Sequence, residues 1–253
     1  FIASAGYLDD PMQQWPWLEQ VLTQLGAEPL RMGADEVDLE AVASAEPDLI
    51  IGMPSWLAGT REQLERLAPV IATPGSAGVR EGITLLGEAL GLEDRAAAVI
   101  AGWDARIAGE LNGLAPEGAT IAVMRTDEEG VFRVMANPSY GPVALMLQAG
   151  FAIAPEVLAL PVDPDGFGST LSLERLDVLA GADVLVVLGF SPEPTKTFLA
   201  NPLAQSVPAI AQGRVLLIEQ GAGAQAIAIM SPLNFDVVQP FAARAAELAA
   251  TAN

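Results

Sequence analysis

The sequence predicts an α/β fold made of two lobes of similar strand–helix construction, joined by one long helix. Three observations support this prediction: a helical stripe over residues 92–114, short runs of buried β-forming residues, and a weak internal repeat. The chain has 253 residues, of which 51% are hydrophobic. That is enough apolar material for two modest cores.

The long helix is predicted from the spacing of its apolar side chains. Steps of three or four residues separate the members of one helix face, Ala96, Ile100, Trp103, Ile107, Leu111 and Leu114. Glu93 and Asp94 lie in the first turn, where carboxylates favour the positive end of the helix dipole. Gly113 and Pro116 end the pattern. Such a helix is roughly 30 Å long and can reach from one lobe to another, although an ordinary amphipathic core helix has the same pattern.

The first lobe alternates expected strands with expected helices. Strands are expected at 1–3, 28–32, 48–52 and 70–72, and helices at 18–25, 37–45, 60–67 and 81–90. The apolar run at 48–52 is typical of a parallel strand covered on both faces. Because ligands of open α/β sheets bind at the carboxyl ends of strands, the following segment, Met53–Trp56, is a candidate ligand segment. A Gly-rich loop is expected at 74–80.

The second lobe repeats this construction. Strands are expected at 120–124, 131–135, 184–188 and 215–218, and helices at 143–148, 173–180, 195–199 and 240–250. The segment Gly189–Pro192 follows a buried strand as Met53–Trp56 does. Residues 39–51 and 173–186 also share a pattern, in which Leu-Glu opens a helix and Asp precedes a buried strand, the second copy being one residue longer.

The charge balance argues against several classes of partner. The chain has 32 acidic and 12 basic residues, a net charge of −20, and Lys196 is its only lysine. No basic stripe is present to neutralise phosphates, so we expect no nucleic-acid partner. Electrostatic docking on an anionic lipid surface is disfavoured for the same reason. No apolar run reaches the ~18 residues of a membrane-spanning helix.

The absence of cysteine and histidine excludes several kinds of chemistry. Thiol catalysis, disulfides and cysteine–zinc sites are excluded, as are the Ser-His-acid triad and imidazole metal ligands. Gly221–Ala226 matches G-x-G-x-x-A, so a dinucleotide-binding enzyme is one alternative, although no clear βαβ unit follows. Asp163 and Asp165 form either a calcium site or an ordinary solvated loop.

Loose motifs along the chain carry a family resemblance. They are Asp38–Val42, Glu46–Gly52, Leu64–Val70, Leu86–Gly91, Leu171–Leu176, Ala182–Val187, Asn201–Leu203, Val207–Ala209 and Gln212–Val215. In order and spacing these motifs resemble the substrate-binding proteins of ABC importers for ferric siderophores and cobalamin. The resemblance covers nearly all of residues 28–250.

The resemblance implies two Rossmann-like three-layer lobes with a ligand cleft between them. The N-terminal lobe is expected at 1–91, the linking helix at 92–115 and the C-terminal lobe at 116–253. The first strand and helix of the family would precede Phe1, so we expect them to be absent from this sequence or the strands of the first lobe to be rearranged.

The implied function is that of a carrier rather than an enzyme. The resemblance implies a monomer on the periplasmic or extracellular face of the membrane, with a lipid anchor in many family members. It captures a ferric siderophore and delivers it to the membrane subunits of an ABC importer. Iron is expected only as part of the ligand, with no cofactor and no metal ligands from the chain. Cobalamin or another chelate, or an enzyme or sensory domain with the same fold, are the alternatives.

The resemblance also implies one glutamate in each lobe that meets arginines of the importer. The matching positions are Glu40 and Glu174. Both lie at expected helix starts, where a carboxylate is also favourable as a partner of the helix dipole. Docking and helix stabilisation therefore both remain open.

Eight residues near expected strand ends are candidates for ligand contact. They are Tyr7, Trp15, Trp56 and Arg80 in the first lobe and Arg125, Tyr140, Phe190 and Ser191 in the second, with the loop Gly221–Gly223. Aromatic rings suit flat chelates, and arginines suit the carboxylate or catecholate oxygens of an anionic ferric complex. The alternatives are surface salt bridges for the arginines, core packing for the tryptophans and a turn for Tyr140.

Overall fold

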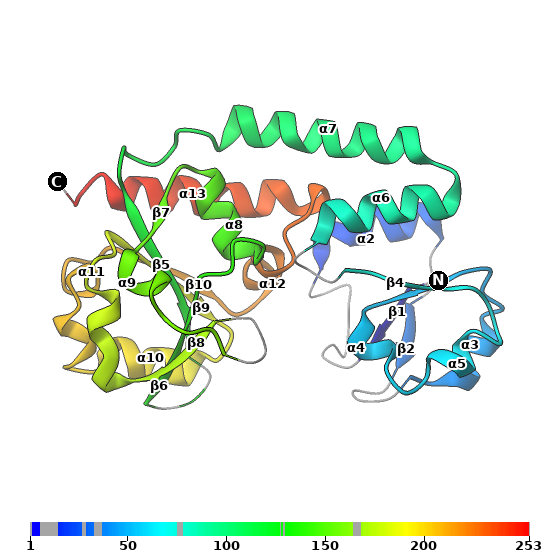
Figure 1. The fold of residues 1–253 in the computed structure, drawn as a ribbon, viewed down its shortest axis with the longest axis horizontal. Coiled ribbons are helices and arrows are strands. Elements are labelled where there is room, and N and C mark those ends of the chain that lie inside the picture. Colours follow the sequence, from blue (N-terminus) through cyan, green and yellow to red (C-terminus); the bar gives the residue numbers. More distant parts are fainter. Residues whose placement is uncertain are drawn as a thin grey trace. The chain divides into compact units, whose positions relative to one another are not determined.

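The computed structural model describes residues 2–5, 15–26, 29–32, 37–74, 78–126, 128, 130–163 and 168–252. The chain divides into two compact parts, unit 1 (Phe1–Ile100) and unit 2 (Ala101–Asn253), and the division falls within one helix. Strands and helices alternate in both units, so the predicted α/β class is confirmed (Figure 1).

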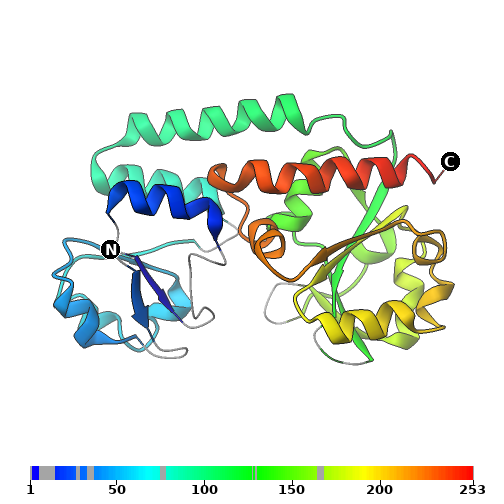
Figure 2. The ribbon, with the colours of Figure 1, turned by 180° about the vertical axis from the view of Figure 1, so that it is seen from behind.

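Unit 1 contains two parallel strand pairs. β1 (Ile2–Ala5) pairs with β2 (Pro29–Met32), and β3 (Ile50–Gly52) pairs with β4 (Val70–Ala72). Its helices are α2 (Pro16–Leu25), α3 (Leu39–Ser44), α4 (Pro54–Leu57), α5 (Arg61–Leu64) and α6 (Val79–Leu90). Buried Val42, Leu57 and Leu64 form a small core against β3 and β4. The helix α2 runs beside α6 (Figures 1 and 2).

Two expected loops of unit 1 are partly helical. The segment after β3 forms the short helix α4, which Pro54 opens at its first position. The loop expected at 74–80 is shorter, because α6 begins at Val79. The helix α3 begins after Asp38, whose side chain accepts a hydrogen bond from the Ala41 amide at 2.9 Å.

The predicted long helix is confirmed as α7 (Glu93–Glu110). It ends four residues before Leu114, because the chain turns at Leu111–Gly113 and Gly113 adopts a left-handed φ of 78°. Within unit 1, α7 packs closely on α6. A Cβ atom on Gly87 of α6 would lie 2.5 Å from the Cβ of Ala96, so only glycine allows this approach.

Within unit 2, Arg106 ties the second half of α7 to the last helix, α13 (Phe235–Ala249) (Figure 2). Its guanidinium donates to Glu110 at 2.8 Å and to Asp236 at 2.6 Å, and lies 4.3 Å from the ring centre of Phe235. The hydrogen bonds with Glu110 and Asp236 raise the pKa of Arg106 above its usual value. The Arg106 guanidinium therefore stays protonated.

Unit 2 is built on one sheet with the strand order β10-β9-β5-β6-β8, and β7 also pairs with β5. The strands are β5 (Thr120–Arg125), β6 (Val131–Met135), β7 (Ala152–Ile153), β8 (Ser169–Ser172), β9 (Val184–Gly189) and β10 (Val215–Glu219). β6 is antiparallel to both of its neighbours, whereas β7, β9 and β10 run parallel to β5. Every residue of β9 is buried, as its apolar run predicts.

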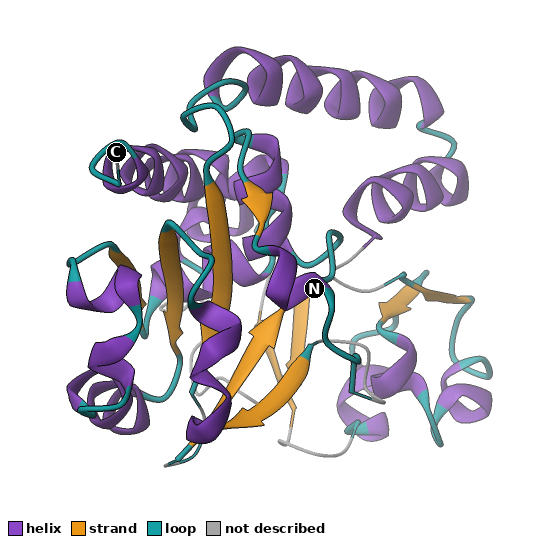
Figure 3. Ribbon diagram, turned by 60° about the vertical axis from the view of Figure 1, so that its left-hand side comes forward, coloured by secondary structure: helices purple, strands orange, loops and turns teal. Residues whose placement is uncertain are grey.

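Helices cover both faces of this sheet (Figures 1 and 3). They are α8 (Gly141–Gln148), α9 (Pro155–Leu158), η2 (Leu173–Leu179), α10 (Pro192–Ala200), η3 (Ala204–Ser206), α11 (Pro208–Ala211), α12 (Ala222–Ala228), η4 (Pro232–Asn234) and α13. On one face, Phe198 of α10 packs on Phe132 with ring centres 5.6 Å apart. The other face meets α12, whose Gly223 lies against Ile218 of β10. Unit 2 thus has the predicted three layers.

Two helix assignments in unit 2 differ from expectation. The segment 173–180 is a 3₁₀ helix with a kink at Arg175 rather than an α-helix. The last helix begins at Phe235, five residues before the expected start at Pro240, which lies inside it. As the sixth residue of α13, Pro240 has no N–H to donate to the carbonyl of Asp236, one turn earlier. Among the described helices, none has the length and apolar character needed to cross a membrane.

Gly141 provides a test of the packing of unit 2. A Cβ atom at this first residue of α8 would contact the carbonyl oxygen of Ile227 and lie 3.1 Å from that of Ala228. We expect Gly141→Ala to lower the free energy of unfolding by about 1–3 kcal/mol, measured by urea denaturation. Gly102→Ala in α7 is the control, because open space surrounds Gly102. It is expected to raise stability by about 1 kcal/mol. Equal changes in both variants would contradict the steric argument.

Candidate functional site

The carboxyl ends of three parallel strands meet at one edge of the sheet in unit 2 (Figure 3). β5 pairs with β9, with Arg125 opposite Leu188, and β9 pairs with β10. Arg125, Phe190 and Ser191 therefore leave the sheet at the same edge. Open α/β sheets bind their ligands at this edge.

Arg125 lies beside a second arginine, Arg133, which is not among the candidates expected from the sequence. In the antiparallel pairing of β5 and β6, Arg125 is directly opposite Arg133, so both side chains are on the same face. Like charges in such a pair repel. The Arg133 guanidinium is balanced by Asp163 at 3.1 Å, and its Nε donates to Thr170 Oγ1 at 3.1 Å. Arg125 is partly buried, with its Nε shielded from solvent.

Phe190 and Ser191 follow the buried strand β9 and are both partly buried. Ser191 is the N-cap residue of α10, but its side chain makes no capping hydrogen bond. Its backbone carbonyl accepts the Thr195 amide at 3.1 Å. The Ser191 hydroxyl is thus not used to cap the helix, and an aromatic ring stands next to it in the chain.

The structure places Tyr140 at the start of α8. It is the N-cap residue of α8 and partly buried, and its amide donates to the Asn137 carbonyl at 3.0 Å. The next residue, Gly141, lies against the Ile227 and Ala228 carbonyls. The start of α8, which includes Tyr140, is therefore held beside the last turn of α12.

The segment Gly221–Gly223 is a helix start rather than the expected loop. It follows β10, and α12 begins at Ala222. A Cβ atom on Gly223 would lie 2.9 Å from Cζ of Phe241 in α13. Close packing between α12 and α13 therefore accounts for a glycine here.

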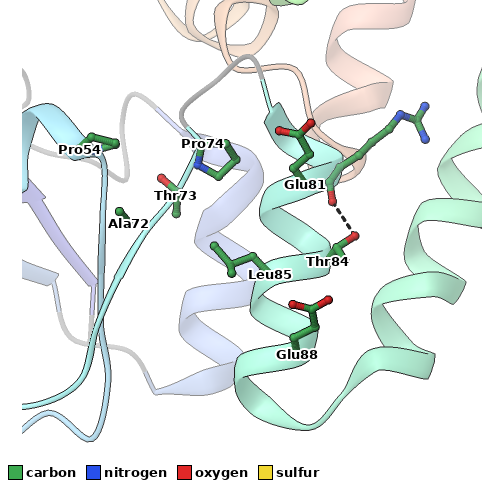
Figure 4. A pocket seen from close by; sticks show the side chains of 9 residues that line it. Pro54, Ala72, Thr73, Pro74, Glu81, Thr84, Leu85 and Glu88 are labelled. Atoms are coloured by element: carbon green, nitrogen blue, oxygen red, sulfur yellow. Dashed lines mark hydrogen bonds between the residues drawn. The ribbon is translucent and has the colours of Figure 1, made fainter.

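Unit 1 has a pocket of about 540 Å³ between the carboxyl ends of β3 and β4 and the side of α6 (Figure 4). Its lining residues are Pro54, Ala72, Thr73, Pro74, Arg80, Glu81, Thr84, Leu85 and Glu88. Leu85 points from α6 toward β4 (Figure 4). The pocket is open to solvent, and its volume lies within the range of small-ligand sites.

Of the four candidates in unit 1, the structure brings Arg80 to this pocket. Arg80 lies in the first turn of α6, and its carbonyl accepts the Thr84 hydroxyl at 3.0 Å. Trp15 precedes α2 and is partly buried, and its indole Nε1 is buried without a hydrogen-bond partner in the described part of the chain. Trp56 lies in α4, but its side chain is outside the description, as is all of Tyr7.

Glu40 and Glu174 occupy equivalent places in the two units. Each is exposed and is the second residue of a short helix, α3 or η2. Both carboxylates therefore face solvent near a helix start, as expected both for docking to the importer and for stabilisation of the helix.

The only lysine of the chain lies on α10. Lys196 Nζ donates to Glu193 Oε1 at 2.8 Å, and this hydrogen bond raises the pKa of the exposed lysine. The charge of Glu219 acts in the same direction. Lys196 is therefore cationic at neutral pH.

The acidic segment near Asp163 has a structural role. The Asp163 carboxylate accepts the amide and the hydroxyl of Thr170 at 2.9 and 2.7 Å, in addition to the contact with Arg133. Asp165 lies outside the described residues. Within the ranges that are described, no group of three or more carboxylates is placed to hold a metal ion.

Comparison with known proteins gives one family match. Residues 9–221 match the family described as periplasmic binding protein. None of the curated protein sequences is significantly similar to the chain.

Three solved structures illustrate the structural likeness. PiaA of Streptococcus pneumoniae in complex with ferrichrome superposes with a TM-score of 0.76 at 20% identity, over 96% of this chain and 84% of that chain. FhuD2 of Staphylococcus aureus with bound ferrioxamine B superposes with a TM-score of 0.73 at 17% identity, over 100% of this chain and 91% of that chain. A periplasmic solute binding protein from Mycobacterium smegmatis superposes with a TM-score of 0.77 at 23% identity, over 98% of this chain and 85% of that chain. The predicted fold class is confirmed by these likenesses.

Proposed function

The chain belongs to the periplasmic binding protein family, and from this premise we propose that it captures a ferric siderophore and delivers it to an ABC importer. The observation that carries the proposal is the meeting of Arg125, Phe190 and Ser191 at the carboxyl edge of the sheet in unit 2. The ligands of PiaA and FhuD2 named above, ferrichrome and ferrioxamine B, support this choice of ligand.

The three side chains supply the contacts that a ferric chelate requires. The Arg125 guanidinium donates charge-assisted hydrogen bonds to chelate oxygens. The Ser191 hydroxyl adds a neutral donor, and the Phe190 ring covers apolar ligand surface. Iron arrives already coordinated by siderophore oxygens, so we propose that the chain provides no iron ligand and needs no cofactor. In unit 1, the pocket that includes Arg80 is a second candidate contact region.

The cellular role follows from the same premise. We propose that the protein acts as a monomer without catalytic function, on the periplasmic or extracellular side of the membrane, with a lipid anchor. Glu40 and Glu174 are the proposed contacts with the importer. Both are exposed, one in each unit, so both are accessible to membrane subunits.

A tryptophan-fluorescence titration tests the proposed function. The purified chain is titrated with ferrichrome, ferrioxamine B, ferric citrate, a ferric tricatecholate, cobalamin and haem. We expect saturable quenching by one ferric siderophore class with a Kd near micromolar or tighter, equivalent to about −8 kcal/mol or better. Free tryptophan amide titrated in parallel corrects for ligand absorption. Saturation by cobalamin alone would identify the alternative chelate, and no saturation by any ligand, with native circular dichroism, would contradict the proposal.

A further inference from the structure

Two buried threonines connect the strand ends that carry Arg125 and Phe190. Thr126 follows Arg125, Thr195 lies in α10, and they are 1% and 2% exposed. Their hydroxyl oxygens are 2.8 Å apart. The Thr195 hydroxyl is also 2.8 Å from the backbone carbonyl of Ser191 and donates to it. A chain of hydrogen bonds therefore runs from the end of β5 to the loop after β9.

The direction of these hydrogen bonds follows from the hydrogens available. A threonine hydroxyl has one hydrogen to donate. Thr195 directs its hydrogen to the Ser191 carbonyl, so Thr126 is the donor between the two threonines. Removing the Thr195 hydroxyl leaves the buried Thr126 hydroxyl without an acceptor for its hydrogen. Removing the Thr126 hydroxyl leaves the Thr195 oxygen without that donor, but Thr195 still donates to the Ser191 carbonyl. Both changes loosen the link between the strand ends.

We propose that Thr126 and Thr195 are positioning residues for ligand binding, an inference that rests on the proposed function. Being buried, neither hydroxyl contacts a ligand at the surface. Thr126 fixes the backbone immediately after Arg125, and Thr195 fixes the carbonyl of Ser191. Binding groups held in place before the ligand arrives lose less conformational freedom on binding. The two hydroxyls thus keep Arg125 and Ser191 at a fixed separation.

Thr120 provides a matched control at the opposite end of the same strand. Its hydroxyl donates to the Gly181 carbonyl at 2.8 Å and lies 2.9 Å from Asp183 Oδ2. Thr120→Val therefore removes the hydrogen bonds of a threonine hydroxyl at the amino end of β5, whereas Arg125 lies at its carboxyl end. Any loss of ligand affinity that comes only from fewer hydrogen bonds to β5 appears equally in Thr120→Val and Thr126→Val.

The test compares affinities by calorimetry on the full chain, with ferrichrome, ferrioxamine B, ferric citrate and a ferric tricatecholate as probes. We expect Thr126→Val to weaken the tightest of these complexes by about fivefold to tenfold, the loss that one displaced hydrogen bond produces. Thr120→Val is expected to stay within about twofold of the unaltered chain, although both variants lower the unfolding temperature. Thr126→Ser keeps the hydroxyl and is expected to restore most of the affinity.

A double-mutant cycle separates positioning from general weakening. Because Thr126 acts through Arg125, Thr126→Val is expected to cost little further affinity once Arg125→Gln is present. Additive losses would overturn the proposal, as would equal affinities of Thr126→Val and Thr120→Val. If the unaltered chain binds none of the probes, the proposed function is contradicted and this inference with it. Binding by the unaltered chain combined with unchanged binding by Thr126→Val contradicts the positioning role alone.

Discussion

Replacing Arg125 with glutamine is expected to weaken binding of the ferric chelate by about tenfold to a hundredfold. Hydrogen bonds to a charged group contribute roughly 1.5–3 kcal/mol, and about 1.4 kcal/mol corresponds to a factor of ten. Arg125 is partly buried at the carboxyl end of β5, opposite Leu188 of β9, so a shortened neutral side chain loses both charge and reach. Calorimetry on the unaltered and variant chains measures the difference.

The matched control for this variant is Arg244→Gln. Arg244 lies on α13 and is exposed, and its guanidinium bonds to Glu247 in the same helix at 2.6 Å. The control changes the net charge by the same amount, so it reports any general electrostatic effect on the ligand. If both variants bind the chelate as tightly as the unaltered chain, Arg125 is not a ligand contact.

Replacing Glu40 and Glu174 together with alanine is expected to abolish iron uptake while leaving ligand affinity unchanged. Both side chains are exposed, and neither lies at the strand edge that carries Arg125. Their loss removes a helix-dipole partner worth roughly 0.3–1 kcal/mol each, too little to unfold the protein. Uptake of radioactive iron is measured in cells that carry the cognate importer, and affinity is measured on the purified variant.

Glu62→Ala with Glu156→Ala serves as the control pair. These glutamates are also exposed first-turn residues of short helices, Glu62 in unit 1 and Glu156 in unit 2. The control pair is expected to keep normal uptake. Equal loss of uptake in both double variants would mean that general acidity, rather than the two docking positions, decides delivery. Loss of affinity in Glu40→Ala with Glu174→Ala would instead indicate misfolding.

Elements with strong periodicity were predictable from the sequence. The helix α7 has five turns over which its apolar steps are visible, and Trp103 and Leu111 of that stripe are buried. The strand β9 is an unbroken apolar run, and all of it is buried. The helix α4 was not predictable in this way, because four residues are too few to show a helical period.

The candidate site was predictable where it depends on strand direction alone. Carboxyl ends of parallel strands meet at one edge, so Arg125 and Phe190 were expected together. Arg133 was not expected at this site, because its position opposite Arg125 depends on the register of the hairpin of β5 and β6. The hydrogen bond between Thr126 and Thr195 joins residues 69 positions apart, a separation that no local pattern encodes.

The strand order of unit 2 also has a consequence for how the chain folds. β5 reaches β6 through a short hairpin, but its contact with β9 closes a loop of about sixty residues, as the bond between Thr120 and Asp183 shows. Non-local pairings form later than hairpins. Until β9 joins, the backbone N–H and C=O groups along one side of β5 have no strand partner. The side chains of Ile121 and Val123, which are fully buried in the native sheet, lie on the same strand. The strand ends that carry Arg125 and Phe190 therefore come together only after this long loop has closed, and an unpaired strand of this kind favours aggregation in the meantime.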